Sequence, residues 1–212
     1  MGQPGQSREV VYIVEDDDAA RALYCGVARS MGLDFEAFAR AVPFLECCEA
    51  LRPGCLVLDL VLPDLSGLAV QRELTLRGIT IPVIFVTGKG QITSAVAAMR
   101  QGAFNFLEKS SSNAELVENI RQAIALDHSH RRLTDQVDAI RGKLDLLTPR
   151  ESDVLHEVIS GQSNKIIAHK LHLSQRSIEL HRSRIMEKMG AGSVAQLVRM
   201  LLSVKGQDES SP

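Results

Sequence analysis

In this chain, acidic side chains come directly after two short apolar runs. Asp59 comes after the run 55–58, and Glu15 and Asp16 come straight after the run Val10–Val14. Runs of this length, rich in β-branched and aliphatic residues, indicate buried strands of a parallel sheet, whose carboxyl ends bind ligands at one edge. Crowded carboxylates repel one another and are best tolerated around a cation, and oxygen ligands alone suit Mg²⁺. The sequence therefore predicts a Mg²⁺ site at this edge of the sheet.

Two further apolar runs end in side chains that bind phosphate. Thr87 follows residues 82–86, and Lys109 follows residues 104–108. An ammonium and a metal ion offset the charge of a phosphoryl group, and a hydroxyl donates a hydrogen bond to it. A single acid after a strand is most often a solvated turn or a helix cap, so no one of these residues is specific. Together they predict one phosphoryl-binding site made of Glu15, Asp16, Asp59, Thr87 and Lys109.

The elements that would position this site alternate between strand and helix patterns up to Lys109, and only helical patterns follow. Pro63 and Gly67 come after Asp59, and the aromatic Phe106 stands three residues before the lysine. With this pattern, residues 8–127 resemble the receiver domain of two-component response regulators. The resemblance implies an α/β fold, a doubly wound (βα)5 parallel sheet of the flavodoxin or CheY type.

By the same resemblance, Asp59 accepts a phosphoryl group from the phosphohistidine of a histidine kinase. Phosphorylation adds roughly −1.5 to −2 charges there. Movement of Thr87 toward the phosphoryl group and reorientation of Phe106 are the implied switch. The implied contacts are Glu15, Asp16, Asp59 and the backbone carbonyl of Val61 with Mg²⁺, and Thr87 and Lys109 with the phosphoryl oxygens.

Two positions depart from the receiver pattern. Ser110 follows Lys109 where the family usually has Pro, often with a cis peptide bond. Because a cis bond costs about 2.5–4 kcal/mol without Pro, we expect the Lys109–Ser110 peptide to be trans or strained, which affects the aim of the lysine. Glu15 stands where Asp is common, and its longer arm would reach the metal through a water.

Length and composition are those of an ordinary globular protein, with 212 residues of which 45% are hydrophobic and 24% charged. That length predicts one or two domains with real cores. No apolar run reaches the ~18 residues of a membrane span, and residues 1–7 hold no apolar signal segment, so we expect a cytoplasmic protein without a membrane partner. The four cysteines fall in the first third without CxxC spacing, which favours core thiols over zinc or a disulfide.

The charge is unevenly distributed along the chain. Residues 1–128 hold 11 basic and 16 acidic side chains, whereas residues 148–205 hold nine and five. A basic C-terminal piece on an acidic body favours a nucleic-acid-binding module, although an excess of this size is also found on ordinary surfaces.

A long helical pattern follows the last predicted strand. Asn113 is a good N-cap, and no Pro interrupts residues 113–148. From Leu133 to Leu147, apolar residues recur at alternating steps of four and three, which is a heptad seam. We expect one long helix or two nearly collinear ones. The seam lies in the predicted linker, 128–146, and is either a coiled-coil dimer contact or one apolar stripe on a solvated helix.

Residues 147–205 predict four short helices. Thr148 and Glu151 form a capping box around Pro149. The second and third helices are joined by a tight turn at 172–174, and the third carries Arg and His, which indicates a helix-turn-helix. The pattern resembles the all-α, four-helix DNA-binding domain of the FixJ/NarL (LuxR-type) family, so nearly the whole chain resembles a FixJ-like transcription regulator. The resemblance rests on residues 148–151, Gly161, Asn164, Lys165, Ile167, Ala168, Leu173, Ser174, Ser177, Ile178, His181 and Lys188.

The recognition helix of that family would be Gln175–Met189, with its N-terminal turns in the major groove. Arg182 and Arg184 are two residues apart on a helix, so they cannot both face DNA ideally. The alternative to a DNA contact is that one of them is simply a solvated surface side chain. In the same alternative His181 is a packing residue and Glu179 pairs with an Arg. The implied contacts are Glu179, Leu180 and Ser183 with bases, and Lys165, Arg176, His181, Arg182 and Arg184 with phosphates.

The sequence therefore predicts a two-component response regulator whose phosphorylation on Asp59 controls sequence-specific DNA binding. The implied partners are a histidine kinase, double-stranded promoter DNA, RNA polymerase, and a second copy of the chain that joins on phosphorylation through the face of the fourth helix, fifth strand and fifth helix. One alternative is an enzyme, but aspartate-phosphate hydrolases need a second Asp where this chain has Val61. Only self-catalysed phosphotransfer and autodephosphorylation are expected. The other is a phosphorylation-independent DNA-binding regulator that uses the receiver as a dimerisation module, which Ser110 leaves open.

Overall fold

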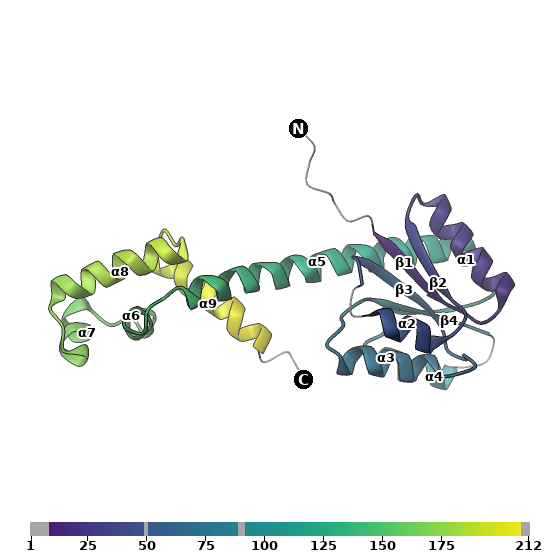
Figure 1. Cartoon of the computed structure of the whole chain (residues 1–212), viewed down its shortest axis with the longest axis horizontal. Helices are drawn as coiled ribbons and strands as arrows, with labels where there is room; N and C mark the ends of the chain where they lie inside the picture. The colour runs from purple at the N-terminus through teal and green to yellow at the C-terminus, as the bar shows by residue number, and fades with distance from the viewer. Residues whose placement is uncertain (1–8, 49–50, 89–91, 209–212) are drawn as a thin grey trace. The chain divides into compact units, whose positions relative to one another are not determined.

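A computed structural model describes residues 9–48, 51–88 and 92–208 (Figure 1). The chain divides into two compact units, residues 1–130 and 131–212, and the boundary lies inside one helix. The predicted absence of a signal segment concerns residues 1–7, which lie outside the described residues. Within the described residues, no helix is both long and apolar enough to cross a membrane.

In its described residues, the first unit is built on a five-stranded parallel sheet. The strands, in spatial order, are β2 (Asp34–Phe38), β1 (Val10–Val14), β3 (Gly54–Asp59), β4 (Val83–Thr87) and β5 (Asn105–Glu108). β1, β3 and β4 are buried along their whole length, which is why their sequences are continuous apolar runs. The order confirms the predicted doubly wound fold, and the direction of winding reverses between β1 and β3.

Helices cover both faces of this sheet (Figure 1). They are α1 (Asp18–Ser30), α2 (Ala41–Cys47), α3 (Gly67–Leu76), α4 (Ile92–Arg100) and the first part of α5 (Asn113–Asp145). Successive residues of a strand point to opposite faces, so each strand supplies two cores. Val11 and Ile13 pack with α1 and α5, whereas Tyr12 and Val14 pack in the core that contains residues of α2 and α3. Because β1, β3, β4 and β5 pair in parallel, the loops that follow them all leave the same edge of the sheet.

Two glycines, one at the start of β3 and one at the start of α3, let neighbouring backbone approach closely. A Cβ on Gly54 would lie 1.8 Å from the carbonyl oxygen of Val10, and one on Gly67 would lie 2.3 Å from the carbonyl oxygen of Asp59. Side chains essentially never come this close to backbone, so any larger residue would displace the strand. Gly67 is the first residue of α3, and its packing fixes the position of the Asp59 backbone.

α5 is one continuous helix of 33 residues, which decides between the two predicted arrangements. The predicted N-cap, Asn113, is wrong by one residue, because Ser112 Oγ accepts a hydrogen bond from the Glu115 N–H at 3.2 Å. Ser and Asn are both good caps, so residue type alone could not separate these neighbours. The boundary between the two units falls after residue 130, within the predicted linker 128–146.

Much of the heptad seam, which begins in α5 and ends at Leu147, is covered inside its own chain. Ile140, Leu144 and Leu147 pack against the core of the second unit, and Val137 is buried. Leu133 differs from them, because 54% of its surface is exposed. The seam therefore serves intramolecular packing, an arrangement that neither predicted alternative included.

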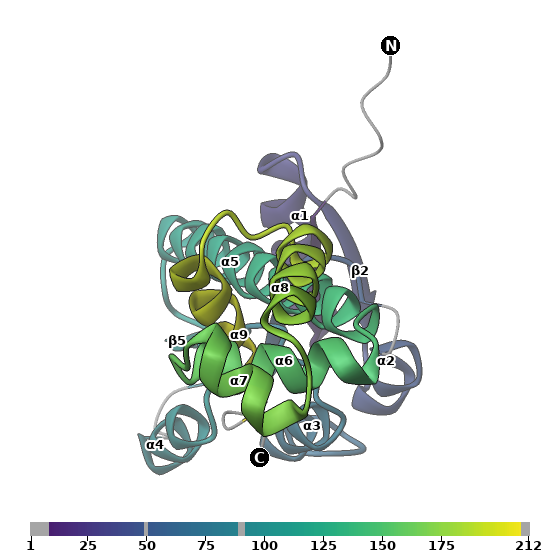
Figure 2. The ribbon, with the colours of Figure 1, turned by 90° about the vertical axis from the view of Figure 1, so that its left-hand side faces the viewer.

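The second unit contains the predicted helix-turn-helix (Figure 2). Its further helices are α6 (Pro149–Ile159), α7 (Asn164–Leu171), α8 (Gln175–Met189) and α9 (Val194–Asp208). The capping box is confirmed, because Thr148 Oγ1 accepts from the Glu151 N–H and Glu151 Oε2 accepts from the Thr148 N–H at 2.9 Å. The turn between α7 and α8 begins at His172, whose φ of 52° is left-handed. α8 has the predicted bounds and buries Ile178 in the core of the unit.

Candidate functional site

Three acidic side chains meet at the carboxyl edge of the sheet, beside the reversal in winding. Asp59 is the last residue of β3, and Glu15 and Asp16 follow β1. One oxygen of each lies within 4.8 Å of the others. Asp59 and Glu15 are only 5% and 1% exposed, whereas Asp16 is open to solvent. The structure thus brings together the three carboxylates that were predicted to bind a metal.

Lys109 reaches this cluster from the residue after β5. Its Nζ donates to Glu15 Oε1 and to Asp59 Oδ2, at 2.7 Å each. Burial disfavours the ammonium, but the two carboxylates outweigh burial, so the pKa of Lys109 is raised. The peptide bond to Ser110 is trans, as expected, since no cis bond occurs among the described residues. Lys109 is thus aimed at Asp59 without a Pro after it.

The hydrogen bonding of Glu15 is incomplete. Its Oε1 accepts from Lys109 and from the Asp17 N–H at 3.1 Å, but its Oε2 is buried and has no hydrogen-bond partner in the described structure. Burial raises the pKa of Glu15, and the hydrogen bond from Lys109 offsets only part of this. A buried carboxylate oxygen without a donor is costly, and a cation would satisfy it.

The remaining predicted receiver residues line the same edge. Thr87 is 1% exposed at the end of β4, and its carbonyl oxygen accepts from the Lys109 N–H at 2.7 Å. The Val61 N–H donates to Asp59 Oδ1 at 3.2 Å, while the Val61 side chain is 60% exposed. Phe106 is half-buried in β5 and packs against the core on the α2 and α3 face of the sheet.

Two charged residues that the sequence did not single out hold the loops of this site. Arg21 in α1 donates to the carbonyl oxygens of Glu15, at 2.9 Å, and Asp16, at 3.2 Å. Asp64, in the loop after β3, accepts from the first two N–H groups of α2, at 3.1 and 2.9 Å. Both contacts join a side chain to backbone of another segment, which no spacing pattern reports. For Arg21, the one signal available in the sequence is an Arg in the first helical turn after an acidic loop.

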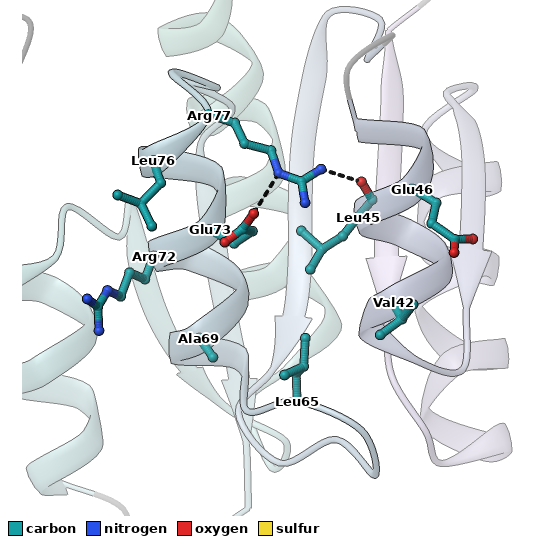
Figure 3. A pocket seen from close by; sticks show the side chains of 9 residues that line it. All are labelled: Val42, Leu45, Glu46, Leu65, Ala69, Arg72, Glu73, Leu76 and Arg77. Carbon is teal, nitrogen blue, oxygen red and sulfur yellow. Dashed lines mark hydrogen bonds and ion pairs between the residues drawn. The ribbon is translucent and has the colours of Figure 1, made fainter.

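A separate feature of the first unit is a groove between α2 and α3 (Figure 3). Its cavity of about 640 Å³ is lined by apolar side chains such as Val42 and Leu76. On its rim, Arg77 donates to Glu73 and to the Leu45 carbonyl oxygen, at 2.8 Å each. The residues that line the groove include none of the predicted site residues.

The exposed face of α8 carries polar, apolar and basic side chains. Arg176, Glu179, Leu180 and Ser183 are all exposed and recur at steps of three and four, so they lie on one side of the helix. Arg184 is exposed too and follows Leu180 by one turn. We call these five residues the α8 stripe. Lys165, near the start of α7, is also exposed.

Two predicted contact residues lie off the α8 stripe. Arg182 follows the core residue Ile178 by four positions, is half-buried, and lines a cavity of about 210 Å³ shared with α9. His181 is half-buried, and its Nδ1 is buried without a hydrogen-bond partner in the described structure. Both residues lie on the side of α8 that packs against its own unit. This position does not favour the phosphate contacts that were predicted for His181 and Arg182.

An ion pair fastens the C-terminal end of α8 to α6. Lys188 Nζ donates to Glu151 Oε2 at 2.6 Å and to the Leu146 carbonyl oxygen at 3.0 Å. Glu151 is 3% exposed. The hydrogen bond from Lys188, followed by the one from the Thr148 N–H, lowers the pKa of Glu151 to about 2. The pair therefore orients the helix that carries the α8 stripe.

Both parts of the chain match known protein families. Residues 11–121 match the response regulator receiver domain, and residues 145–201 match the bacterial regulatory proteins of the luxR family. The two matches coincide with the sheet that holds Asp59 and with the helices around α8.

Several proteins are similar over nearly the whole chain. The response regulator protein TmoT of Ectopseudomonas mendocina is 38% identical over 92% of this chain and 89% of its own length. The transcriptional regulatory protein FixJ of Rhizobium meliloti strain 1021 is 37% identical over 91% of this chain and 95% of its own length. The solved structure of the response regulator StyR is 35% identical, with a TM-score of 0.81 over 92% of this chain and 98% of that one. This chain belongs to the two-component response regulators that join a receiver domain to a LuxR-type DNA-binding domain and regulate transcription.

Proposed function

We propose that Asp59 accepts a phosphoryl group from the phosphohistidine of a histidine kinase and that this event controls binding of α8 to promoter DNA. The carboxylate cluster at the edge of the sheet carries the proposal. Asp59 lies 2.7 Å from the Lys109 ammonium, and a buried oxygen of Glu15 has no hydrogen-bond partner in the described structure. Membership of a family that pairs a receiver with a DNA-binding domain supports both the kinase and the DNA as partners.

In the transfer, a carboxylate oxygen of Asp59 attacks phosphorus. A P–O bond forms, the P–N bond to the kinase histidine breaks, and the departing ring nitrogen keeps the electron pair and takes a proton from solvent. Lys109 stays protonated and pairs with a phosphoryl oxygen, and the Thr87 hydroxyl donates to another. These two side chains thereby offset the charge that the carboxylates would otherwise repel.

We assign a Mg²⁺ site to Glu15, Asp16, Asp59 and the Val61 carbonyl. The donor set supports it, because it consists of oxygens only, includes the buried Oε2 of Glu15 that has no partner in the described structure, and leaves Asp16 open to solvent. Bound Mg²⁺ supplies positive charge that stabilises the phosphoryl oxygens.

The site favours a stored phosphoryl group over turnover of external substrates. A hydrolase of the aspartyl-phosphate class needs a second carboxylate two residues after the nucleophile, and that position is the exposed Val61. We therefore propose self-catalysed phosphotransfer and autodephosphorylation as the chemistry of Asp59.

The phosphoryl group places roughly −1.5 to −2 charges on Asp59, beside the carboxylates of Glu15 and Asp16. We propose that Thr87 moves toward the phosphoryl group, that Phe106 reorients, and that the face of α4, β5 and α5 then forms a homodimer. A shift in the ratio of active to inactive molecules from 1:99 to 99:1 requires about 5.5 kcal/mol. A few charge-assisted hydrogen bonds and a dimer interface together supply this free energy. The dimer would place two α8 helices in major grooves one helical turn apart. We propose RNA polymerase as the further partner of the DNA-bound dimer.

The α8 stripe is the proposed DNA surface. A Glu accepts a hydrogen bond from cytosine N4, and a Leu packs against a thymine methyl group. The off-stripe residues His181 and Arg182 are left out of the proposed contacts. The proposed contacts are Glu179, Leu180 and Ser183 with bases, and Arg176, Arg184 and Lys165 with phosphates.

Sedimentation velocity with Mg²⁺, with and without beryllofluoride, tests the proposal. We expect wild type to shift from monomer to dimer and Asp59→Asn to stay a monomer. The control Asp153→Asn removes an exposed carboxylate of α6 and should behave as wild type does. If all three proteins respond alike, Asp59 is not the switch. If all three are dimers throughout, the phosphorylation-independent regulator becomes the better account.

A further inference from the structure

Arg21 lies against the loop that carries Glu15 and Asp16. Its Nη1 donates to the carbonyl oxygen of Glu15 at 2.9 Å and to that of Asp16 at 3.2 Å, and its Nη2 contacts the Asp18 carboxylate. The side chain is 22% exposed. One guanidinium therefore holds two successive carbonyl groups at the point where β1 ends and the acidic loop begins.

These contacts matter because the two carboxylates are held differently. Glu15 is 1% exposed, and its Oε1 is tied to Lys109 and to the Asp17 N–H. Asp16 is exposed, so the direction of its side chain depends on how its own peptide groups are held. A planar guanidinium bonded to both carbonyls fixes the two peptide planes from which the carboxylates project.

We propose that Arg21 is a positioning residue for the cation site. By fixing the backbone of Glu15 and Asp16, it aims their carboxylates toward Asp59 and does not itself touch the ion. This inference rests on the proposed Mg²⁺ site and adds a residue outside the ligand set. Groups that orient metal ligands are typically worth about 10- to 100-fold in metal affinity.

Charge and position predict opposite consequences of removing Arg21. A cation beside the site repels a second cation, so loss of the guanidinium charge alone would tighten metal binding. Loss of the two hydrogen bonds would release the acidic loop and weaken metal binding. The sign of the change in affinity therefore separates positioning from simple electrostatics.

Mn²⁺ binding, followed by the electron paramagnetic resonance signal of the free ion, reports affinity without any phosphotransfer. Arg21→Met removes both the charge and the donors, whereas Arg21→Lys keeps the charge but replaces the planar guanidinium with a flexible ammonium. Arg29→Gln is the matched control, since it removes a charge from the same helix about 12 Å along its axis. We expect about 10-fold weaker binding for Arg21→Met, an intermediate loss for Arg21→Lys, and wild-type affinity for the control.

Equal or tighter Mn²⁺ binding by Arg21→Met would overturn the proposal. If circular dichroism finds that variant unfolded, Arg21→Lys decides, because weaker binding with a native spectrum supports positioning and wild-type binding overturns it. Asp59→Asn separates this inference from the proposed function. If Asp59→Asn binds Mn²⁺ as wild type does, the metal site itself is wrong. If it loses binding while Arg21→Met keeps it, only the positioning role fails.

Discussion

The ion pair between the buried Glu151 and the partly exposed Lys188 should contribute measurably to the stability of the DNA-binding domain. The pKa of Glu151 is lowered from 4.5 to about 2. At 1.36 kcal/mol per pKa unit, this shift corresponds to about 3 kcal/mol. Because Lys188 is 33% exposed and solvent screens it, we expect Glu151→Gln to cost about 2 kcal/mol. Gln retains the capping acceptor for the Thr148 N–H and removes only the charge.

Hydrogen–deuterium exchange of peptides from α6 and α8 measures this cost in the intact chain. A loss of about 2 kcal/mol speeds exchange of the core amides roughly 30-fold at neutral pH. Since the folded pKa is depressed, the stabilisation is complete above about pH 4.5 and is lost as pH falls toward 2, so the ratio of variant to wild type should shrink over that window. Asp153→Asn, which breaks an exposed pair with Arg150, should change exchange little. Equal exchange in Glu151→Gln and Asp153→Asn would refute the reasoning.

Three further substitutions probe the site and the DNA surface. Gly67→Ala should destabilise the receiver by about 1–3 kcal/mol in urea unfolding and slow phosphorylation of Asp59, because the added Cβ meets the Asp59 carbonyl oxygen. Gly26→Ala, which has open space around the added Cβ, should be neutral or stabilising. Equal effects of the two substitutions would contradict the packing argument. Asp64→Ala removes the acceptor for the start of α2 and should cost about 1 kcal/mol by the same measurement, and an unchanged midpoint would contradict the cap. Arg176→Ala should weaken binding to all DNA sequences alike and reduce the slope of log affinity against log salt by about 1, whereas a change for one sequence only would assign Arg176 to a base.

The sequence anticipated the features that depend on residue type and regular spacing. Continuous apolar runs located the buried strands, and polar residues at their ends located Glu15, Asp59 and Lys109 at one edge. α8 was found with its bounds because a cap at Ser174 and a stop at Gly190 leave little freedom between them.

Contacts between a side chain and the backbone of another segment were missed. Arg21 and Asp64 both bind backbone groups of other segments, and no periodicity records such a contact. The packing of the heptad seam inside its own chain was also missed. An apolar pattern such as that of Ile140 and Leu144 suits a partner helix and intramolecular packing equally well. Arg182 shows the same limit, because a basic residue in a recognition helix can lie on either side of it.

The central claim is that the phosphorylation state of Asp59 controls DNA binding, and fluorescence anisotropy tests it most directly. The DNA is a fragment selected from genomic DNA by the protein treated with acetyl phosphate and Mg²⁺. We predict that this treatment tightens binding by wild type about 5- to 150-fold and leaves Asp59→Asn unchanged. Equal affinity of treated wild type, untreated wild type and Asp59→Asn would contradict the account.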